Sequence, residues 1–171
     1  VRDAVIAAME RPDAAHYSHP LGTKEFRTAA AGRLNEKYSY SVDPDRYIMA
    51  FPGSELALQT AMLPFLSAEC VVLVPDPGYL AITIDPAALG AKAVEVPLSE
   101  GNHFALDVTA FEKKLTSKTK MVILTYPNNP TGTVYSPNEI RALCRFIVEH
   151  DLVLLCDCAF DDYIFDGKEL L

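Results

Sequence analysis

Short apolar runs alternate with helical patterns from about residue 54 onward, and this alternation constrains the fold more than any other feature of the chain. The run Val71-Val72-Leu73-Val74 has no polar residue, so both faces of its strand should be buried. The expected order is helix 54–66, strand 71–74, a segment at 79–88, strand 92–96, helix 108–116, strand 121–125, helix 137–149 and strand 152–156. This order predicts an α/β fold, a three-layer α/β/α arrangement with a mostly parallel sheet and right-handed crossovers.

The amino-terminal part has a different pattern, with helical periodicity at 2–10 and 23–37 and a short expected strand at 46–51. The chain has 171 residues, of which half are apolar, which suits one globular domain with a sizeable core. It opens at Val1 inside a helical pattern and closes at Leu171 just past a turn. We therefore expect a segment of a longer protein.

Charge and hydropathy exclude several classes of partner. The net charge of −8 and the pI near 4.9 argue against a nucleic-acid or anionic-membrane partner. No apolar run approaches the roughly 18 residues of a membrane helix, and no charged-then-apolar leader occurs at the amino terminus. We therefore expect no membrane partner and a cytoplasmic location.

The cysteines and histidines do not have the spacing of metal ligands. Cys70, Cys144, Cys156 and Cys158 lack a C-x-x-C pair, and we expect buried structural thiols, with the last two on opposite faces of a strand. His16 and His19 lie beside Pro20, which disfavours a helix carrying both. We expect no metal site.

Two strands of the predicted sheet end in polar residues that suit a binding site. The loop Tyr126-Pro127-Asn128-Asn129-Pro130-Thr131-Gly132 follows the apolar run 121–124, and its two asparagine amides can donate or accept hydrogen bonds. Alone it could be an ordinary polar turn. However, strand 152–156 runs directly into Asp157, and parallel sheets bind ligands outside the carboxyl ends of their strands. Asn129 and Asp157 should therefore lie on the same edge of the sheet.

A possible anion site occurs at Phe51-Pro52-Gly53-Ser54-Glu55, where a helix begins. Ser54 suits the N-cap position, Gly53 allows close backbone approach, and the positive end of the helix dipole favours a phosphate. The alternative is an ordinary capped helix without a ligand.

An aromatic residue follows the strand at 71–74. In Pro75-Asp76-Pro77-Gly78-Tyr79 the turn residues should present Tyr79 at the edge of the sheet, where its ring could stack on a planar ligand or merely cover the core. A phosphate site, a stacking ring, the Asn129 amide and the Asp157 carboxylate together suit pyridoxal 5′-phosphate. A carboxylate beside its pyridine nitrogen would keep that nitrogen protonated.

Two of these segments carry a family resemblance. The loop 126–132 is similar to an N-P-N-N-P-T-G motif, and Asp157-Cys158-Ala159-Phe160 is similar to a D-E-x-Y motif. On these residues the chain resembles, over nearly all its length, the class I and II aminotransferases, which are fold-type I pyridoxal-phosphate enzymes. The resemblance implies that residues 1–171 are part of the large cofactor-binding domain, with its remainder and the small domain outside the segment.

The resemblance also implies roles for individual residues. Asn129 would bond the 3′-oxygen of the cofactor, Asp157 would pair with the pyridine nitrogen, and Tyr79 would stack on the ring. Gly53, Ser54 and the Glu55 amide would hold the phosphate, provided that the Glu55 side chain points away from it.

A third segment is similar to the family's Y-x(4)-G-x(3)-L-R pattern. It comprises Tyr17 to Gly22 followed by Glu25-Phe26-Arg27. The resemblance implies a homodimer in which Tyr17 reaches the phosphate in the partner's site. Without the resemblance, Tyr17 would be interpreted as a packing aromatic.

The chain also departs from the family pattern. Phe160 stands where the family usually has a tyrosine whose hydroxyl contacts the 3′-oxygen, and Cys158 replaces a common glutamate. The Schiff-base lysine and the arginine for the substrate carboxylate are expected beyond Leu171. The lysines present are interpreted as surface charges: Lys113, Lys114, Lys118, Lys120 and Lys168.

The resemblance implies that the parent protein is an aminotransferase, which moves an amino group from an amino acid to a 2-oxo acid. Two alternatives share the same fold. One is a pyridoxal-phosphate-dependent carbon-sulfur lyase. The other is a non-catalytic sensor domain of a transcription regulator, with which Phe160 and Cys158 would be compatible.

Overall fold

The computed structural model describes residues 1–165 and residue 167. The chain divides into two compact units, one from Val1 to Phe51 and the other from Pro52 onward. Among the described residues, no helix is long and apolar enough to cross a membrane.

The first unit consists of three helices, α1 (Arg2–Met9), α2 (Lys24–Tyr38) and α3 (Pro44–Tyr47). The strand expected at 46–51 is wrong. Asp43 caps α3 by accepting a hydrogen bond from the Asp45 amide, and Pro44 fixes a helical φ at the first position, so the chain enters a helix there. The backbone after α3 is irregular, and the Ala50 amide bonds the Leu21 carbonyl.

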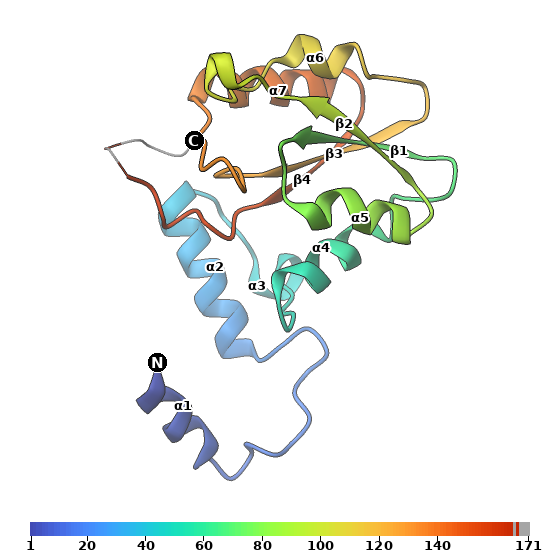
Figure 1. The fold of residues 1–171 in the computed structure, drawn as a ribbon. Helices are drawn as coiled ribbons and strands as arrows, with labels where there is room; N and C mark the ends of the chain where they lie inside the picture. Colours follow the sequence, from blue (N-terminus) through green and yellow to red (C-terminus); the bar gives the residue numbers. More distant parts are fainter. Residues whose placement is uncertain (166, 168–171) are drawn as a thin grey trace. The chain divides into compact units, whose positions relative to one another are not determined.

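The second unit contains a four-stranded parallel sheet (Figure 1). Its strands are β1 (Val71–Asp76), β2 (Lys92–Pro97), β3 (Thr119–Thr125) and β4 (Val153–Asp157), in the spatial order β2-β1-β3-β4. Every neighbouring pair is parallel, so each connection crosses over through a segment that lies on one face. The four strands expected beyond residue 54 are confirmed.

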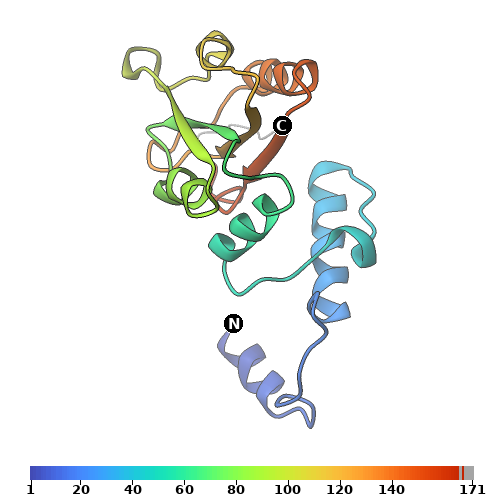
Figure 2. The same ribbon diagram turned by 90° about the vertical axis from the view of Figure 1, so that its right-hand side faces the viewer.

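Helices cover both faces of this sheet. α4 (Ser54–Met62) and α5 (Leu80–Ala88) lie on one face, and α6 (Val108–Glu112) and α7 (Pro137–Glu149) lie on the other (Figures 1 and 2). Between β2 and α6 the chain forms a short 3₁₀ helix at Glu100–Asn102. The expected α/β/α arrangement is confirmed, although α4 and α6 end four residues earlier than the patterns at 54–66 and 108–116 suggested.

The core has two parts, one on each side of the sheet. Alternate residues of a single strand enter opposite parts: Leu73 packs with Phe111 and Phe146, whereas Val72 packs with Leu58 and Ile82. All of these side chains are buried. The apolar run at 71–74 is therefore buried on both faces, as expected, and it holds β1 inside the sheet.

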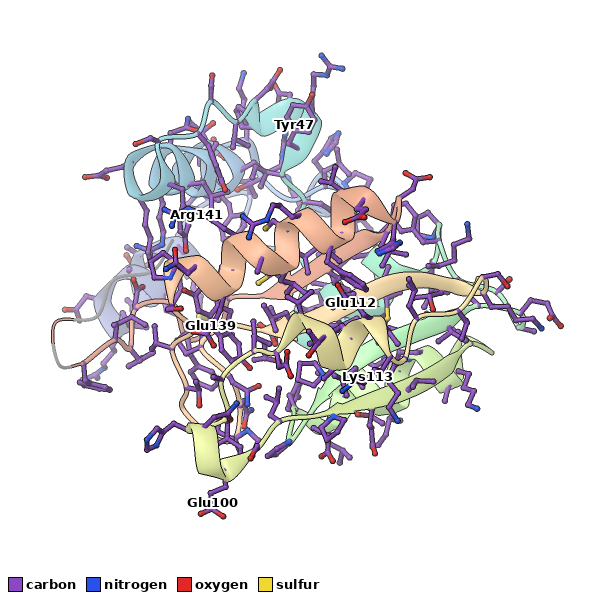
Figure 3. All side chains as sticks on the ribbon, turned by 90° about the horizontal axis from the view of Figure 1, so that it is seen from above. Tyr47, Glu100, Glu112, Lys113, Glu139 and Arg141 are labelled. Carbon is purple, nitrogen blue, oxygen red and sulfur yellow. The ribbon has the colours of Figure 1, made fainter. Side chains whose placement is uncertain are left out.

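Helix α7 begins at a capping box. The Ser136 hydroxyl accepts a hydrogen bond from the Glu139 amide, and the Glu139 carboxylate accepts one from the Ser136 amide at 2.8 Å. The second oxygen of Glu139 accepts a hydrogen bond from the Leu106 amide at 2.7 Å. Glu139, near the start of α7 in Figure 3, therefore fixes both the helix start and the loop that precedes α6.

Candidate functional site

Three loops leave the carboxyl edge of the sheet from neighbouring strands. β3 lies between β1 and β4, so the loop after Thr125 has the loop after Asp76 on one side and Asp157 on the other. Thr125 pairs in register with Asp157, and the Tyr126 amide donates to the Asp157 carbonyl at 2.8 Å. The Asn-Pro loop and the acid at the end of β4 therefore share one edge, as expected.

Within the loop after β3, Asn128 has the structural contacts. Its side chain is only 3% exposed, and its Nδ2 donates to the Pro77 carbonyl at 3.1 Å and to the Thr131 hydroxyl at 2.8 Å. The Asn128 amide also donates to the Thr133 carbonyl. The side chain of the next residue, Asn129, is half-buried. The two asparagines thus differ, because the first holds the loop and the second is partly accessible to a ligand.

Asp157 presents a carboxylate at the end of β4. The residue is 8% exposed, and its Oδ1 accepts a hydrogen bond from the Ala159 amide at 3.0 Å. Opposite it on β3, the buried Thr125 hydroxyl has no hydrogen-bond partner among the residues that the structure describes. A buried carboxylate that accepts a hydrogen bond from a backbone amide is suited to face a cationic group of a ligand.

A cavity of about 290 Å³ lies beside the loop after β3. It brings Asn129 and Phe160 together, and Tyr163 and Phe165 also line it. The rings of Phe160 and Tyr163 meet edge to face, with centroids 6.3 Å apart. Sequence reasoning missed Tyr163 and Phe165. Their aromatic character and their spacing shortly after Asp157 were the signals that could have indicated them.

The amino-terminal end of α4 differs from the expectation in one respect. Gly53, not Ser54, is the N-cap residue, and Ser54 is the first residue of the helix. Gly53 has φ +107°, which L side chains rarely adopt, so glycine is needed for this entry into the helix. Within residues 1–165 and 167, no side chain caps the first turn, and Gly53, Ser54 and Glu55 are all exposed. The amides of this turn are therefore available to an anion.

Tyr79 lies in the loop that joins β1 to α5. It is the N-cap residue of α5 and is half-buried. Its side chain packs against the core cluster that contains Leu58 and Ile82. Tyr79 thus covers part of the core, and its remaining surface is accessible.

Two residues of the motif in the first unit, Tyr17 and Arg27, differ in exposure. Tyr17 is fully exposed. Arg27 is 6% exposed, and its guanidinium donates to the Pro44 carbonyl and to the Asp45 carboxylate, both at 2.7 Å. The hydrogen bond from Arg27 lowers the pKa of Asp45. Arg27 therefore holds α2 against α3, a structural role that the sequence pattern did not indicate.

The positions and the exposure of the cysteines contradict two of the expectations from the sequence. The sulfur atoms of Cys156 and Cys158 are 3.4 Å apart, so the prediction of opposite faces is wrong: residues two apart in an extended chain share a face. Both are exposed, as is Cys144, whereas Cys70 is half-buried. The expectation of buried thiols is thus wrong for these three. Within the described residues, no three His, Cys, Asp or Glu side chains are placed to hold a metal ion.

The fold and these loops define an α/β protein with a ligand site outside the carboxyl ends of its parallel strands. A comparison with known families matches residues 1–170 to the family described as aminotransferase class I and II. The chain belongs to this family, which uses pyridoxal phosphate, and the resemblance inferred from the sequence motifs is confirmed.

Similar proteins and structures agree with this assignment. The chain is 35% identical over 152 residues to aromatic-amino-acid aminotransferase 2 of Thermococcus litoralis and 34% identical over 151 residues to an aspartate aminotransferase of Pyrococcus abyssi. These matches cover 89% and 88% of the chain, but the chain spans only 39% of the length of each relative.

Among solved structures, the aromatic aminotransferase of Pyrococcus horikoshii OT3 matches with a TM-score of 0.95 and 30% identity, over 99% of this chain and 45% of that one. The N-succinyldiaminopimelate aminotransferase of Mycobacterium tuberculosis matches with a TM-score of 0.89 and 29% identity, over 99% and 43%. Helices α1 to α7 and strands β1 to β4 thus correspond to less than half of each of these enzymes.

Proposed function

We propose that the whole protein is a pyridoxal-phosphate-dependent aminotransferase, which moves an amino group from an amino acid to a 2-oxo acid. The observation that carries the proposal is the buried Asp157 carboxylate, paired in register beside the loop that contains Asn129. The similar proteins support the reaction class, because those compared above are named as aminotransferases. Residues 1–171 would then form part of the large domain.

The groups along this edge fit the cofactor chemically. The uncapped first turn of α4 suits a phosphate, a buried carboxylate suits a protonated pyridine nitrogen, and an aromatic ring suits a planar heterocycle. When bound, pyridoxal phosphate supplies an electron-withdrawing ring that stabilises negative charge at the α-carbon of an amino acid.

Each residue then has a binding or orienting role. Asp157 would hold the proton on the pyridine nitrogen, since an opposite charge favours the protonated form. The amides of Gly53, Ser54 and Glu55 and the Ser54 hydroxyl would bind the phosphate. The exposed Glu55 side chain can remain in water, away from that anion.

The ring itself would be held from two sides. Asn129 would hydrogen-bond the 3′-oxygen, and Tyr79 would stack on the ring. Phe160 would contribute a ring to the wall of the cavity but no hydroxyl. Tyr163 lines the same cavity and is the candidate for that missing hydroxyl. We assign no residue of this chain to proton transfer, and we place the Schiff-base lysine and the carboxylate-binding arginine outside residues 1–171.

The proposed assembly is a homodimer in which Tyr17 completes the phosphate site of the partner subunit. The support within this chain is that the Tyr17 side chain is fully exposed among the described residues. The expected partners are amino acid and 2-oxo acid substrates.

The test uses the full-length protein. Titration with pyridoxal phosphate should produce a saturable change in absorbance, and an amino acid with a 2-oxo acid should give the two exchanged products. Asp157→Ala should lower turnover by about 100-fold or more, because the group that balances charge on the ring is lost. Asp151→Asn, an exposed acid just before β4, is the matched control and should leave turnover unchanged. An Asp157→Ala enzyme with the wild-type rate would overturn the assignment.

Product analysis separates the alternatives. A carbon-sulfur lyase would release a thiol or sulfide with ammonia and a 2-oxo acid, without consuming a second 2-oxo acid. A sensor domain would bind the cofactor and turn over neither substrate.

A further inference from the structure

We propose that Cys156 and Cys158 form an oxidisable dithiol whose closure to a disulfide weakens cofactor binding at Asp157. The thiol chemistry stands on the geometry of the chain alone, whereas the effect on the cofactor rests on the function proposed above. The two sulfur atoms are 3.4 Å apart, and both residues are exposed in the part of the chain that the structure describes.

The two cysteines flank Asp157, the acid of the candidate site, in the sequence. Cys156 and Asp157 are the last two residues of β4, and Cys158 is the first residue after it. Because residues two apart in an extended chain point the same way, the strand itself directs both thiols to one side. No rearrangement elsewhere in the chain is needed to bring these sulfurs together.

A hydroperoxide would act as the oxidant. The Cys158 thiolate attacks the terminal peroxide oxygen, the O–O bond breaks, and an alcohol (or water, from hydrogen peroxide) leaves after protonation. The Cys156 sulfur then attacks the Cys158 sulfenic acid, the S–S bond forms, and water leaves. Both thiols lose their hydrogens, and the peroxide takes up the two electrons. The hydrogen-bonding contact with Cys158 raises the pKa of the Cys156 thiol.

Closure of this bond must bend the strand at Asp157. Two residues of extended chain separate their flanking α-carbons by roughly 6.6 to 7.2 Å. Disulfides place their α-carbons most often about 5.5 to 6 Å apart, so the two cysteines have to move toward each other. The residue between them absorbs this change. Its carbonyl accepts a hydrogen bond from the Tyr126 amide and its carboxylate accepts one from the Ala159 amide, so these bonds set the direction of the carboxylate. Oxidation would therefore displace the carboxylate from the position that suits a pyridine nitrogen.

The experiment treats the reduced full-length protein with hydrogen peroxide, blocks the remaining thiols, and digests it with trypsin. Cleavage after Arg145 and Lys168 places Cys156 and Cys158 in one peptide, whereas Cys144 lies in the separate peptide 142–145. We expect the 146–168 peptide to lose two hydrogen atoms, to resist the blocking reagent, and to recover with dithiothreitol. In parallel, titration of the oxidised protein should give an affinity for pyridoxal phosphate at least about tenfold weaker.

Serine variants distinguish the Cys156–Cys158 pair from the thiol of Cys144. Cys158→Ser and Cys156→Ser should each abolish the peroxide effect on cofactor affinity, whereas Cys144→Ser should retain it. Sulfinic acid in place of the disulfide, or a disulfide that contains Cys144, would overturn the proposal. So would a 156–158 disulfide that leaves cofactor affinity unchanged.

The two proposals fail in different ways. If the reduced protein does not bind pyridoxal phosphate, the proposed function fails, and the coupling to the cofactor is refuted with it. The peptide masses still decide whether the dithiol forms. If the reduced protein binds the cofactor and peroxide leaves the 146–168 peptide fully reduced, only the dithiol is refuted.

Discussion

The side chain of Asn128 donates a hydrogen bond to the carbonyl oxygen of Pro77 across 3.1 Å, and this bond joins the loop after β3 to the loop after β1. Asn129 follows the donor directly, and Tyr79 lies two residues beyond the acceptor. The buried Asn128 side chain therefore holds the loop of Asn129, which is proposed to bond the cofactor, beside the loop of Tyr79, which is proposed to stack on it. Asn128 itself has neither role.

Removal of this amide should affect both stability and binding. Asn128→Ala leaves the Pro77 carbonyl without this donor and removes one hydrogen bond to the Thr131 hydroxyl, which should cost about 1–3 kcal/mol of unfolding free energy. Cofactor affinity should fall as well, because the two loops are no longer joined. Urea denaturation and pyridoxal-phosphate titration measure the two effects. Asn138→Ala, an exposed asparagine on α7, is the control; an equal loss in both variants would contradict a specific role for Asn128.

The aromatic residues beyond Asp157 give a second prediction. Phe160→Tyr places a hydroxyl where the family usually has one, and it should lower the pKa at which the absorbance of the bound cofactor changes, because a hydrogen bond to the 3′-oxygen favours its charged form. Tyr163→Phe should raise that pKa if Tyr163 supplies the hydroxyl in the natural protein. A spectrophotometric pH titration measures both, and coincident curves for wild type and Tyr163→Phe would exclude Tyr163.

The hydrogen bonds of Glu139 lead to a prediction about folding stability alone. Its two oxygens accept hydrogen bonds from the Ser136 and Leu106 amides, so Glu139→Ala should lower the unfolding free energy by about 1–3 kcal/mol. Glu139→Gln keeps one acceptor and should lose less. Glu112→Ala, on the exposed side of α6 in Figure 3, should be nearly neutral in the same denaturation experiment. A loss for Glu112→Ala as large as that for Glu139→Ala would show that the capping interactions do not decide the effect.

The carboxylate of Asp107 should make the folding stability depend on pH. Hydrogen bonding from Thr109 lowers the pKa of this N-cap carboxylate in the folded chain. A folded-state pKa below the unfolded value means that the carboxylate stabilises the fold above about pH 4 and loses this effect as pH falls through the lowered pKa. Asp107→Asn keeps a neutral cap. Its deficit in unfolding free energy relative to wild type should therefore be constant near neutral pH and shrink in acid. A deficit that persists at low pH would assign the effect to packing.

The sequence predicted the β-sheet well because the apolar runs of β1, β3 and β4 are continuous and are bounded by polar or turn residues. It failed at 46–51, where Asp43 and Pro44 begin a helix and local capping outweighs an apolar pattern. At the site, strand ends placed Asp157 and the Asn129 loop on one edge. The division of roles between Asn128 and Asn129 depends on a carbonyl 51 residues away along the chain, which no local pattern contains. The Gly53 cap likewise depends on backbone geometry. The shared face of Cys156 and Cys158, in contrast, follows from the alternation of side chains along a strand.

The register between Thr125 and Asp157 also determines where this chain can accept insertions. One residue added within β4 would move the carboxylate by about 3.3 Å and turn it to the opposite face of the sheet, farther than a hydrogen bond can follow. The connections at the other edge, such as 116–118 before β3 and 150–152 before β4, leave the paired strand ends in place when they lengthen. Length variation among natural or engineered versions of this chain should therefore concentrate at the amino ends of the strands.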